Sequence, residues 1–195
     1  KVGSFGDVGC FSFYGNKVIT TGEGGMCTMN NAVLDERMRM FRDHGMSRTI
    51  KYQHEVVGFN YRMTNLQAAI GLAQLERIGD ILLNRRQYER GYREIMSDKN
   101  VVFQEDLLHR KRITWLVSLL LGRNVDRDKY IKNLNSNGVE VRTFFRTLSS
   151  MNIYKKYCHV EAPVAKGISR QGVNFPTYEN LQSVEKINNI LNSIL

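Results

Sequence analysis

A lysine in a glycine-rich turn is the residue whose type and surroundings best suit covalent chemistry. Lys17 follows Gly15-Asn16 and precedes a turn at residues 22–25 that contains three glycines. A lysine amine is nucleophilic near neutral pH only where desolvation or a cationic neighbour lowers its pKa from about 10.4. Glycines allow positive φ and let the backbone approach a bound group closely. The segment is therefore compatible with a catalytic lysine displayed in a turn.

The same residue types are also typical of an ordinary surface turn. Lys17 is one of 28 basic residues, and a lysine in a turn is usually a solvated charge. The glycine cluster matches neither GxxxxGK[ST] nor GxGxxG, so it does not predict a phosphate-binding loop of either kind. Spacing alone leaves both interpretations open.

Two short strands are expected on either side of Lys17. An apolar and aromatic run covers residues 10–14, and an extended pattern resumes over residues 26–29. Asn30-Asn31 then offers a helix cap, and apolar residues recur at helical spacing until Gly45. Residues 46–63 are polar, aromatic and irregular, and an irregular connection of this length more often carries function than serves only as a link.

A capping box formed by Thr64 and Gln67 opens what should be the longest helix, which reaches about residue 96. Its first half has a broad apolar face and is expected to be buried. Its second half has a narrower apolar face opposite charged residues expected in solvent, among them Arg85, Arg86 and Glu89. Such a helix can bridge two domains, so the predicted domains are residues 1–90 and residues 91–195.

The second half of the chain alternates strands with helices. Strands are predicted at Val101–Phe103, Thr114–Leu121 and Val139–Phe145. Helices are predicted from Asp126 to Asn137-Gly138 and from about Ser183 onward. The basic stretch His109-Arg110-Lys111-Arg112 is expected to be a solvated loop. This alternation predicts a small α/β sandwich.

Composition limits the classes of partner. The formal net charge of +9 favours an anionic partner such as a phosphorylated ligand, but no nucleic-acid-binding signature accompanies it, so no nucleic-acid partner is predicted. No apolar run reaches membrane-spanning length. Cys10, Cys27 and Cys158 lack CxxC spacing, which favours reduced thiols in a cytoplasmic protein. The histidine spacing predicts no metal site.

Five blocks, in order, resemble the DegT/DnrJ/EryC1/StrS family of sugar aminotransferases. The first runs from residue 3 to residue 26 and contains Lys17; the others lie at residues 42–45, 58–64, 138–142 and 174–177. They span nearly the whole chain, which makes the resemblance far more specific than one glycine-rich loop. The family branch that makes 4-amino-4,6-dideoxy sugars is the most similar.

The resemblance implies an α/β fold that forms the C-terminal part of a PLP-dependent transferase of fold type I, namely the end of the large domain plus the small α/β domain. In that family the lysine matching Lys17 binds pyridoxal 5'-phosphate covalently and moves a proton as general acid and base. The serine matching Ser12 contacts the cofactor phosphate through its hydroxyl. The asparagine matching Asn60 reaches the same phosphate from the partner subunit, which implies a homodimer with shared active sites.

The implied reaction moves an amino group from glutamate to a nucleotide-linked 4-keto-6-deoxyhexose. Thr147 and Ser149 stand where the family more often has proline and histidine near the sugar, so the sugar is not fixed. The portion alone is expected to be inactive, because the family's partner for the pyridine nitrogen lies upstream of the matching region. Two alternatives stay open: a non-catalytic member that acts as a regulatory or binding module, and a sugar 3-dehydratase, in which histidine replaces the lysine.

Overall fold

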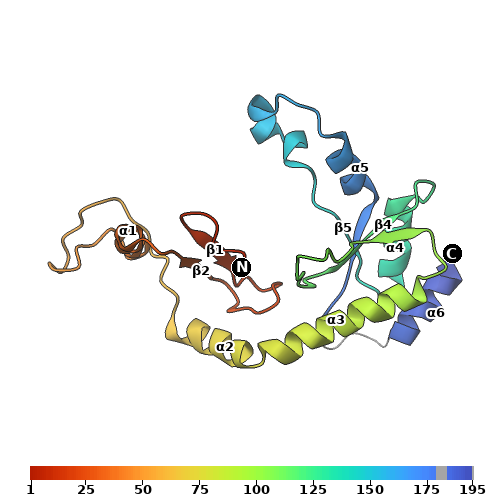
Figure 1. The fold of residues 1–195 in the computed structure, drawn as a ribbon, viewed down its shortest axis with the longest axis horizontal. Coiled ribbons are helices and arrows are strands. Elements are labelled where there is room, and N and C mark those ends of the chain that lie inside the picture. The colour runs from red at the N-terminus through yellow and green to blue at the C-terminus, as the bar shows by residue number, and fades with distance from the viewer. Residues whose placement is uncertain (179–183, 195) are drawn as a thin grey trace. The chain divides into compact units, whose positions relative to one another are not determined.

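Figure 1 shows the chain as a computed structural model that describes residues 1–178 and 184–194. The chain divides into two compact units, Lys1–Ile81 and Leu82–Leu195. The division falls inside one helix, α3 (Ile78–Ile95). The functional assignment of residues 1–90 to one domain and residues 91–195 to another stays a prediction.

The first unit contains a two-stranded antiparallel hairpin and two complete helices. These elements are β1 (Gly9–Ser12), β2 (Gly25–Thr28), α1 (Ala32–Arg42) and α2 (Asn65–Glu76). In the hairpin Cys10 lies opposite Cys27, and Ser12 lies opposite Gly25. The two strands predicted on either side of the lysine are therefore confirmed, each shifted by one or two residues.

Both helices of this unit begin where the sequence predicts. The Asn31 side chain accepts hydrogen bonds from the first free N–H groups of α1. At the start of α2 the Gln67 N–H donates to the Thr64 hydroxyl at 3.3 Å, and the Thr64 N–H donates to the Gln67 side chain at 2.9 Å. A capping box of this kind satisfies two backbone donors that the first turn of a helix leaves open.

The prediction of one long helix from residue 64 to residue 96 is wrong, because the chain breaks at Arg77. The Arg77 N–H turns back to the carbonyls of Gln74 and Leu75, and α3 starts one residue later. Neither glycine nor proline stands at position 77, so the local sequence does not mark the break. The expected burial of the first half is also wrong, since α2 has no buried residue.

The second unit is built on a four-stranded antiparallel sheet with the order β3-β4-β6-β5. Its strands are β3 (Val101–Phe103), β4 (Val117–Leu121), β5 (Arg142–Thr143) and β6 (Gly172–Phe175). Its helices are the C-terminal part of α3, then α4 (Arg127–Ser136), the short 3-10 turns η1 (Leu148–Ser150) and η2 (Asn152–Tyr157), α5 (Pro163–Gln171) and α6 (Val184–Ile194). The predicted α/β character is confirmed.

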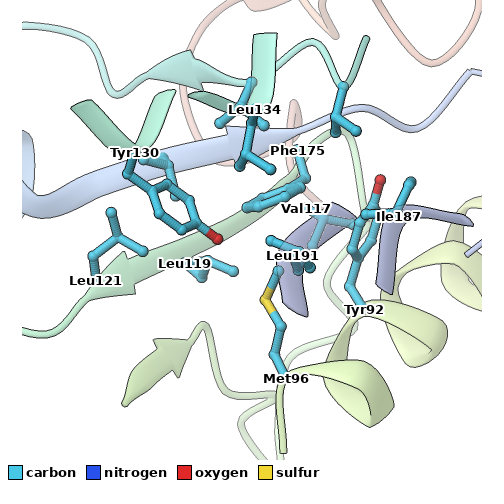
Figure 2. Close-up of a cluster of buried hydrophobic side chains, with 13 residues drawn as sticks. Tyr92, Met96, Val117, Leu119, Leu121, Tyr130, Leu134, Phe175, Ile187 and Leu191 are labelled. Carbon is cyan, nitrogen blue, oxygen red and sulfur yellow. The ribbon is translucent and has the colours of Figure 1, made fainter. Parts of the chain in front are cut away.

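Helices α3, α4 and α6 bury their apolar sides against this sheet. Alternate residues of β4, Val117 and Leu119 among them, are buried, as expected for a strand with one covered face. Figure 2 shows these side chains together with Tyr92 of α3, Leu134 of α4 and Leu191 of α6. The hydrophobic core of the described residues therefore lies in the second unit.

The ends of the second unit's elements follow their hydrogen bonds. Asp126 caps α4, and the left-handed Gly138 follows its end, as predicted. The strand predicted at residues 139–145 is only two residues long, and it starts late because the Val141 N–H donates to the Asn135 side chain at 2.7 Å instead of to a neighbouring strand. The predicted start of the last helix at Ser183 lies outside the described residues. None of the described helices is long and apolar enough to cross a membrane.

A buried carboxylate in α3 corrects the expectation that the charged side of this helix is solvated. Glu89 is buried, and its carboxylate accepts hydrogen bonds from Arg112 at 2.6 Å, Thr114 at 2.6 Å and Arg93 at 2.9 Å. Burial alone raises the pKa of Glu89, but the three hydrogen bonds and the charge of Arg112 outweigh it and lower the pKa to about 2. Arg112, expected in a solvated loop, is therefore part of an ionic cluster.

The neighbouring arginines of α3 explain why β4 starts later than predicted. Arg85 donates to the Trp115 carbonyl at 2.6 Å, and the Thr177 hydroxyl donates to the same carbonyl at 2.8 Å. Arg86 donates to the Arg112 carbonyl at 2.7 Å. Side chains thus hold the backbone of residues 112–115, and regular pairing begins only at Val117 with β6 and at Leu119 with β3.

Candidate active site in residues 1–81

The loop between β1 and β2 carries Lys17 and is closed by backbone hydrogen bonds at its base. The Phe13 N–H donates to the Gly24 carbonyl at 2.9 Å, and the Thr21 N–H donates to the Phe13 carbonyl at the same distance. The Lys17 N–H donates to the Tyr14 carbonyl at 2.9 Å, which fixes the turn at the lysine. The Lys17 side chain is half-buried rather than fully solvated.

Two threonines brace the second half of this loop. The Thr20 hydroxyl donates to the Phe13 carbonyl at 2.9 Å and accepts from the Gly22 N–H at 2.9 Å. The hydroxyl of the buried Thr21 donates to the Glu23 carbonyl at 2.6 Å. Gly22 has a φ of +79°, a left-handed conformation that favours glycine. The glycine-rich segment is thus an ordered turn that is held from inside.

One side of α2 braces the lysine loop from outside. The Gln74 side chain accepts from the Thr20 N–H at 3.0 Å and donates to the Thr20 carbonyl at 3.1 Å. The Gln67 side chain donates to the Glu23 carbonyl at 3.3 Å. At Gly71 an added β-carbon would lie only 2.7 Å from the Thr21 methyl, so α2 comes very close to the loop there.

Sequence reasoning did not identify this support, although a signal for it exists. Positions 67, 71 and 74 are spaced by four and three residues, which places them on one side of a helix. Their residue types, Gln, Gly and Gln, interrupt an otherwise apolar helix. A small and polar stripe of that kind indicates a side that contacts backbone instead of an apolar core.

Ser12 lies at the end of β1, immediately before the lysine loop. Its side chain is exposed, and its hydroxyl oxygen accepts only a long hydrogen bond, 3.4 Å, from the Tyr14 N–H. A hydroxyl has one donor and two acceptor positions, so Ser12 retains capacity for an outside group. Opposite it, a β-carbon at Gly25 would lie 2.7 Å from the Phe11 carbonyl oxygen, so only glycine fits that pairing. The structure therefore places Ser12 and Lys17 in one hairpin.

Asn60 lies at the end of a separate loop. It forms an isolated antiparallel bridge with Asp43, and the His44 N–H donates to the Phe59 carbonyl at 2.9 Å. The rings of Phe59 and Tyr61, on either side of Asn60, stack with centroids 5.1 Å apart. Asn60 itself is exposed. The Asn60 loop is thus built on the C-terminal end of α1, whereas Lys17 lies in the loop between β1 and β2.

The base of the Asn60 loop is held by an ion pair and by two glycines. Arg62 lies 3.3 Å from the Asp43 carboxylate, which assigns this arginine to the support of the loop. A β-carbon at Gly58 would lie 2.0 Å from the Gly45 nitrogen, so the two sides of the loop meet where neither carries a side chain. The irregular segment predicted at residues 46–63 is thus a closed and ordered loop.

A family profile described as the DegT/DnrJ/EryC1/StrS aminotransferase family matches residues 1–195. The chain belongs to this family. Two of the similar proteins with a curated function are GDP-perosamine synthases. GDP-perosamine synthase of Caulobacter vibrioides is 39% identical over 189 residues, and GDP-perosamine synthase of Escherichia coli O157:H7 is 36% identical over 188 residues. Each alignment covers 95% of this chain, and 51% and 50% of the two relatives, respectively.

A solved aminotransferase structure has the same fold as this chain. Helicobacter pylori PseC, an aminotransferase involved in pseudaminic acid biosynthesis, superposes with a TM-score of 0.87 at 26% sequence identity. The superposition covers 100% of this chain and 54% of PseC. The fold predicted from the resemblance, the C-terminal part of fold type I, is therefore confirmed. The chain spans about half the length of the curated relatives it matches.

Proposed function

We propose that the protein to which this chain belongs is a pyridoxal-phosphate-dependent aminotransferase that moves an amino group from glutamate to a nucleotide-linked 4-keto-6-deoxyhexose. The observation that carries the proposal is the half-buried Lys17 in a loop braced from both sides, directly after the exposed hydroxyl of Ser12. The identity of more than 35% to two GDP-perosamine synthases supports a sugar with nitrogen at C4.

The residues present fit the cofactor by the chemistry of their side chains. Pyridoxal 5'-phosphate has an aldehyde that needs a primary amine and a phosphate that needs hydrogen-bond donors. Lys17 offers the amine, and Ser12 and Asn60 offer a hydroxyl and an amide that are both exposed to outside groups. When bound, the cofactor supplies an electron sink that stabilises a carbanion at the carbon bearing nitrogen.

Lys17 is proposed to act as the nucleophile and as the proton carrier of the reaction. A single amine can hold the cofactor, be released by the amino donor and then transfer the proton. Such a role needs a fixed position, because a small displacement of a catalytic group costs much of its rate. The bonds from Thr20, Gln67 and Gln74 to the lysine loop provide that position.

The presence of lysine at position 17 distinguishes the proposal from its enzymatic alternative. A sugar 3-dehydratase of this family has histidine where the aminotransferases have lysine, and this chain has lysine. The remaining alternative, a non-catalytic family member, predicts no covalent cofactor at Lys17. An experiment on that amine therefore separates the two.

The test is to fix the cofactor on its amine with borohydride and to map the modified peptide. In the protein expressed from its complete reading frame, the pyridoxyl group should be on Lys17. Trypsin does not cleave after a modified lysine, so peptides 2–17 and 18–37 should be recovered as one fused peptide, 2–37. Lys17→Arg should abolish the label and turnover together. Lys51→Arg, an exposed lysine of the same unit, is the matched control and should change neither.

Two outcomes would overturn the assignment. A pyridoxyl group on another lysine would remove the role of Lys17. Full turnover by the Lys17→Arg protein would remove the mechanism even if the label were lost.

We further propose that Asn60 contacts the cofactor phosphate of a second copy, in a homodimer with shared active sites. The proposal is supported by the exposure of Asn60 on an ordered loop that is separate from the β1–β2 loop of Lys17. Loss of one hydrogen bond to a charged phosphate costs about 1.5–3 kcal/mol, so Asn60→Ala should weaken cofactor binding roughly 10- to 150-fold.

Mixed dimers test the sharing directly. Co-expression of a Lys17→Ala chain with an Asn60→Ala chain places both lesions in one site and leaves the other site intact. Purified heterodimer, with one intact site of two, should have close to half the wild-type activity, whereas Lys17→Ala alone should stay inactive. Asn30→Ala, an exposed asparagine of the same unit, is the control for Asn60→Ala. If heterodimers form and their activity stays at or below half that of the Asn60→Ala homodimer, sharing is excluded and Asn60 acts within its own chain. If Asn60→Ala alone keeps full cofactor affinity and activity, Asn60 has no role at the phosphate.

A further inference from the structure

Two cysteines far apart in sequence face each other across the β1–β2 hairpin. The register places Cys10 of β1 directly opposite Cys27 of β2, and both are exposed in this unit. Both side chains of a directly opposed pair point to the same side of a sheet. Sequence spacing alone treats these cysteines as unrelated thiols, so the pairing is a result of the strand register.

The type of pair decides how close the two thiols lie. The Phe13 N–H donates to the Gly24 carbonyl, so residues 13 and 24 form a hydrogen-bonded pair. Hydrogen-bonded and non-hydrogen-bonded pairs alternate along an antiparallel ladder, which makes Cys10 and Cys27, three positions along, a non-hydrogen-bonded pair. The α-carbons of such a pair are about 4.5 Å apart. Disulfides span α-carbon separations of about 4.4–6.8 Å.

The side chains already interact in the reduced state. Burial raises the pKa of the Cys27 thiol, and a hydrogen bond with the Cys10 thiol raises it further. Cys158, the third cysteine, is in the other unit.

We propose that Cys10 and Cys27 are a thiol modification site that closes to a reversible cross-strand disulfide. A low-molecular-weight disulfide such as glutathione disulfide is the oxidant. One cysteine thiolate attacks a sulfur of the oxidant, which forms a mixed disulfide and releases one thiol. The second cysteine thiolate attacks the protein sulfur of that mixed disulfide, which forms the Cys10–Cys27 bond and releases the second thiol. Two cysteine thiols are oxidised, one disulfide is reduced to two thiols, and the protons pass to the released thiols.

The Cys10–Cys27 pair lies next to the candidate active site. Cys10 and Ser12 are two residues apart in β1 and so lie on the same side of the strand. Their partners in β2, Cys27 and Gly25, have the same relation. The bond would join the two strands that lead into the lysine loop. The inference stands on the strand register and does not depend on the proposed function.

Peptide mapping under non-reducing conditions tests the proposal. The protein expressed from its complete reading frame is incubated with glutathione disulfide, the remaining thiols are alkylated, and the protein is digested with trypsin. Cys10 lies in peptide 2–17, Cys27 in peptide 18–37 and Cys158 in peptide 157–166. The expected product is peptide 2–17 linked to peptide 18–37, lighter by two hydrogen atoms than the sum of the two, and it should disappear on treatment with dithiothreitol.

Two variants control the assignment. Cys158→Ser removes an exposed cysteine of the other unit and should leave the linked peptide unchanged. Cys27→Ser should abolish the link and leave glutathione attached to Cys10. The proposal is overturned if wild-type Cys10 and Cys27 are both recovered in alkylated form after oxidation. It is equally overturned if either of them is found linked to Cys158 or carries glutathione as the final product.

Discussion

The two units of the chain differ in whether their apolar side chains are buried. Thirteen hydrophobic side chains of the described residues are buried, and all of them lie in residues 82–195. Residues 1–81 are all described, and the buried residues among them are Gly9, Thr21, Gly45 and Ser47. The first unit thus has ordered backbone, caps and turns without an apolar core, whereas the second has a complete core.

Helix α2 shows what this difference means. Leu66, Ile70, Leu72 and Leu75 are all exposed, and they point to different sides of the helix. Apart from the Gln67–Gly71–Gln74 side that contacts the lysine loop, α2 is apolar, and a helix with so little polar surface is typical of the interior of a larger protein. The chain spans about half the length of its curated relatives. We therefore expect α2 to be covered in the protein expressed from its complete reading frame, and the candidate active site to become complete only there.

The largest expected effect separates the two units physically. Residues 82–195 expressed alone should unfold in one cooperative thermal transition, because they retain the whole buried cluster. Residues 1–81 expressed alone should show no cooperative transition, since a hairpin and two helices without a core are only marginally stable. Circular dichroism during heating measures both. A sharp transition in residues 1–81 would contradict the conclusion that only the second unit has a core of its own.

A matched pair of leucines sharpens the same contrast. Leu134→Ala removes a fully buried side chain of α4 and should lower the free energy of unfolding by about 2–5 kcal/mol. Leu66→Ala removes a side chain that is 81% exposed at the start of α2, and in the 195-residue chain its effect should stay within about 0.5 kcal/mol. Urea unfolding gives both values.

The Leu66 variant also tests whether α2 is covered in the protein expressed from its complete reading frame. In the protein expressed from its complete reading frame, Leu66→Ala should become clearly destabilising, as expected for a buried leucine. If its effect stays small there, α2 remains on the surface and its apolar residues have another purpose.

The sequence predicted those parts of the fold whose signals are local. The caps at Asn31, Thr64 and Asp126 and the glycine after α4 each depend on a few neighbouring residues, and all were confirmed. The hairpin that carries Lys17 was predicted for the same reason. These features form wherever the local hydrogen bonds are satisfied, whatever surrounds them.

The parts that could not be predicted depend on residues distant in sequence. Glu89 was assigned to a solvated side because it alternates with arginines, yet its partner Arg112 comes from another segment and makes burial favourable. The pairing of Cys10 with Cys27 depends on strand register. The roles of Lys17, Ser12 and Asn60 rest on the resemblance and stay proposals, because they depend on a ligand and a second chain.

The ionic cluster gives the second unit a predicted dependence on pH. Glu89 has a folded pKa of about 2 and an ordinary value of 4.5, so its contribution to stability is fully present above pH 4.5 and is lost as the pH falls through about 2. Glu89→Gln should lower the free energy of unfolding at pH 7 by about 1.5–3 kcal/mol, because Arg112 keeps its burial but loses a charged partner.

The difference between wild type and Glu89→Gln should shrink as the pH falls from 4.5 to 2. Glu94→Gln, an exposed glutamate of the same helix, is the control and should show neither effect. Urea unfolding at several pH values measures both variants. A constant difference across this range would show that the Glu89 charge does not stabilise the unit.

The smallest expected effect concerns the close approach of α2 to the lysine loop. Two glycines of the first unit, Gly71 in α2 and Gly79 in α3, lie inside helices, where alanine is more favourable than glycine by about 0.5–1 kcal/mol. At Gly79 an added β-carbon meets nothing within 4 Å, so Gly79→Ala should stabilise by about that amount. At Gly71 the β-carbon would lie 2.7 Å from the methyl of the buried Thr21. Gly71→Ala must therefore displace either the helix or the lysine loop.

In the protein expressed from its complete reading frame, the two variants should change the melting temperature in opposite directions. Gly79→Ala should raise the melting temperature and leave cofactor affinity unchanged, whereas Gly71→Ala should lower both by a small amount, because Thr21 holds the turn that follows Lys17. Thermal unfolding and cofactor titration supply the two measurements. If Gly71→Ala stabilises as much as Gly79→Ala and binds cofactor normally, then the lysine loop is not supported by α2, and its order comes from the hairpin and its threonines alone.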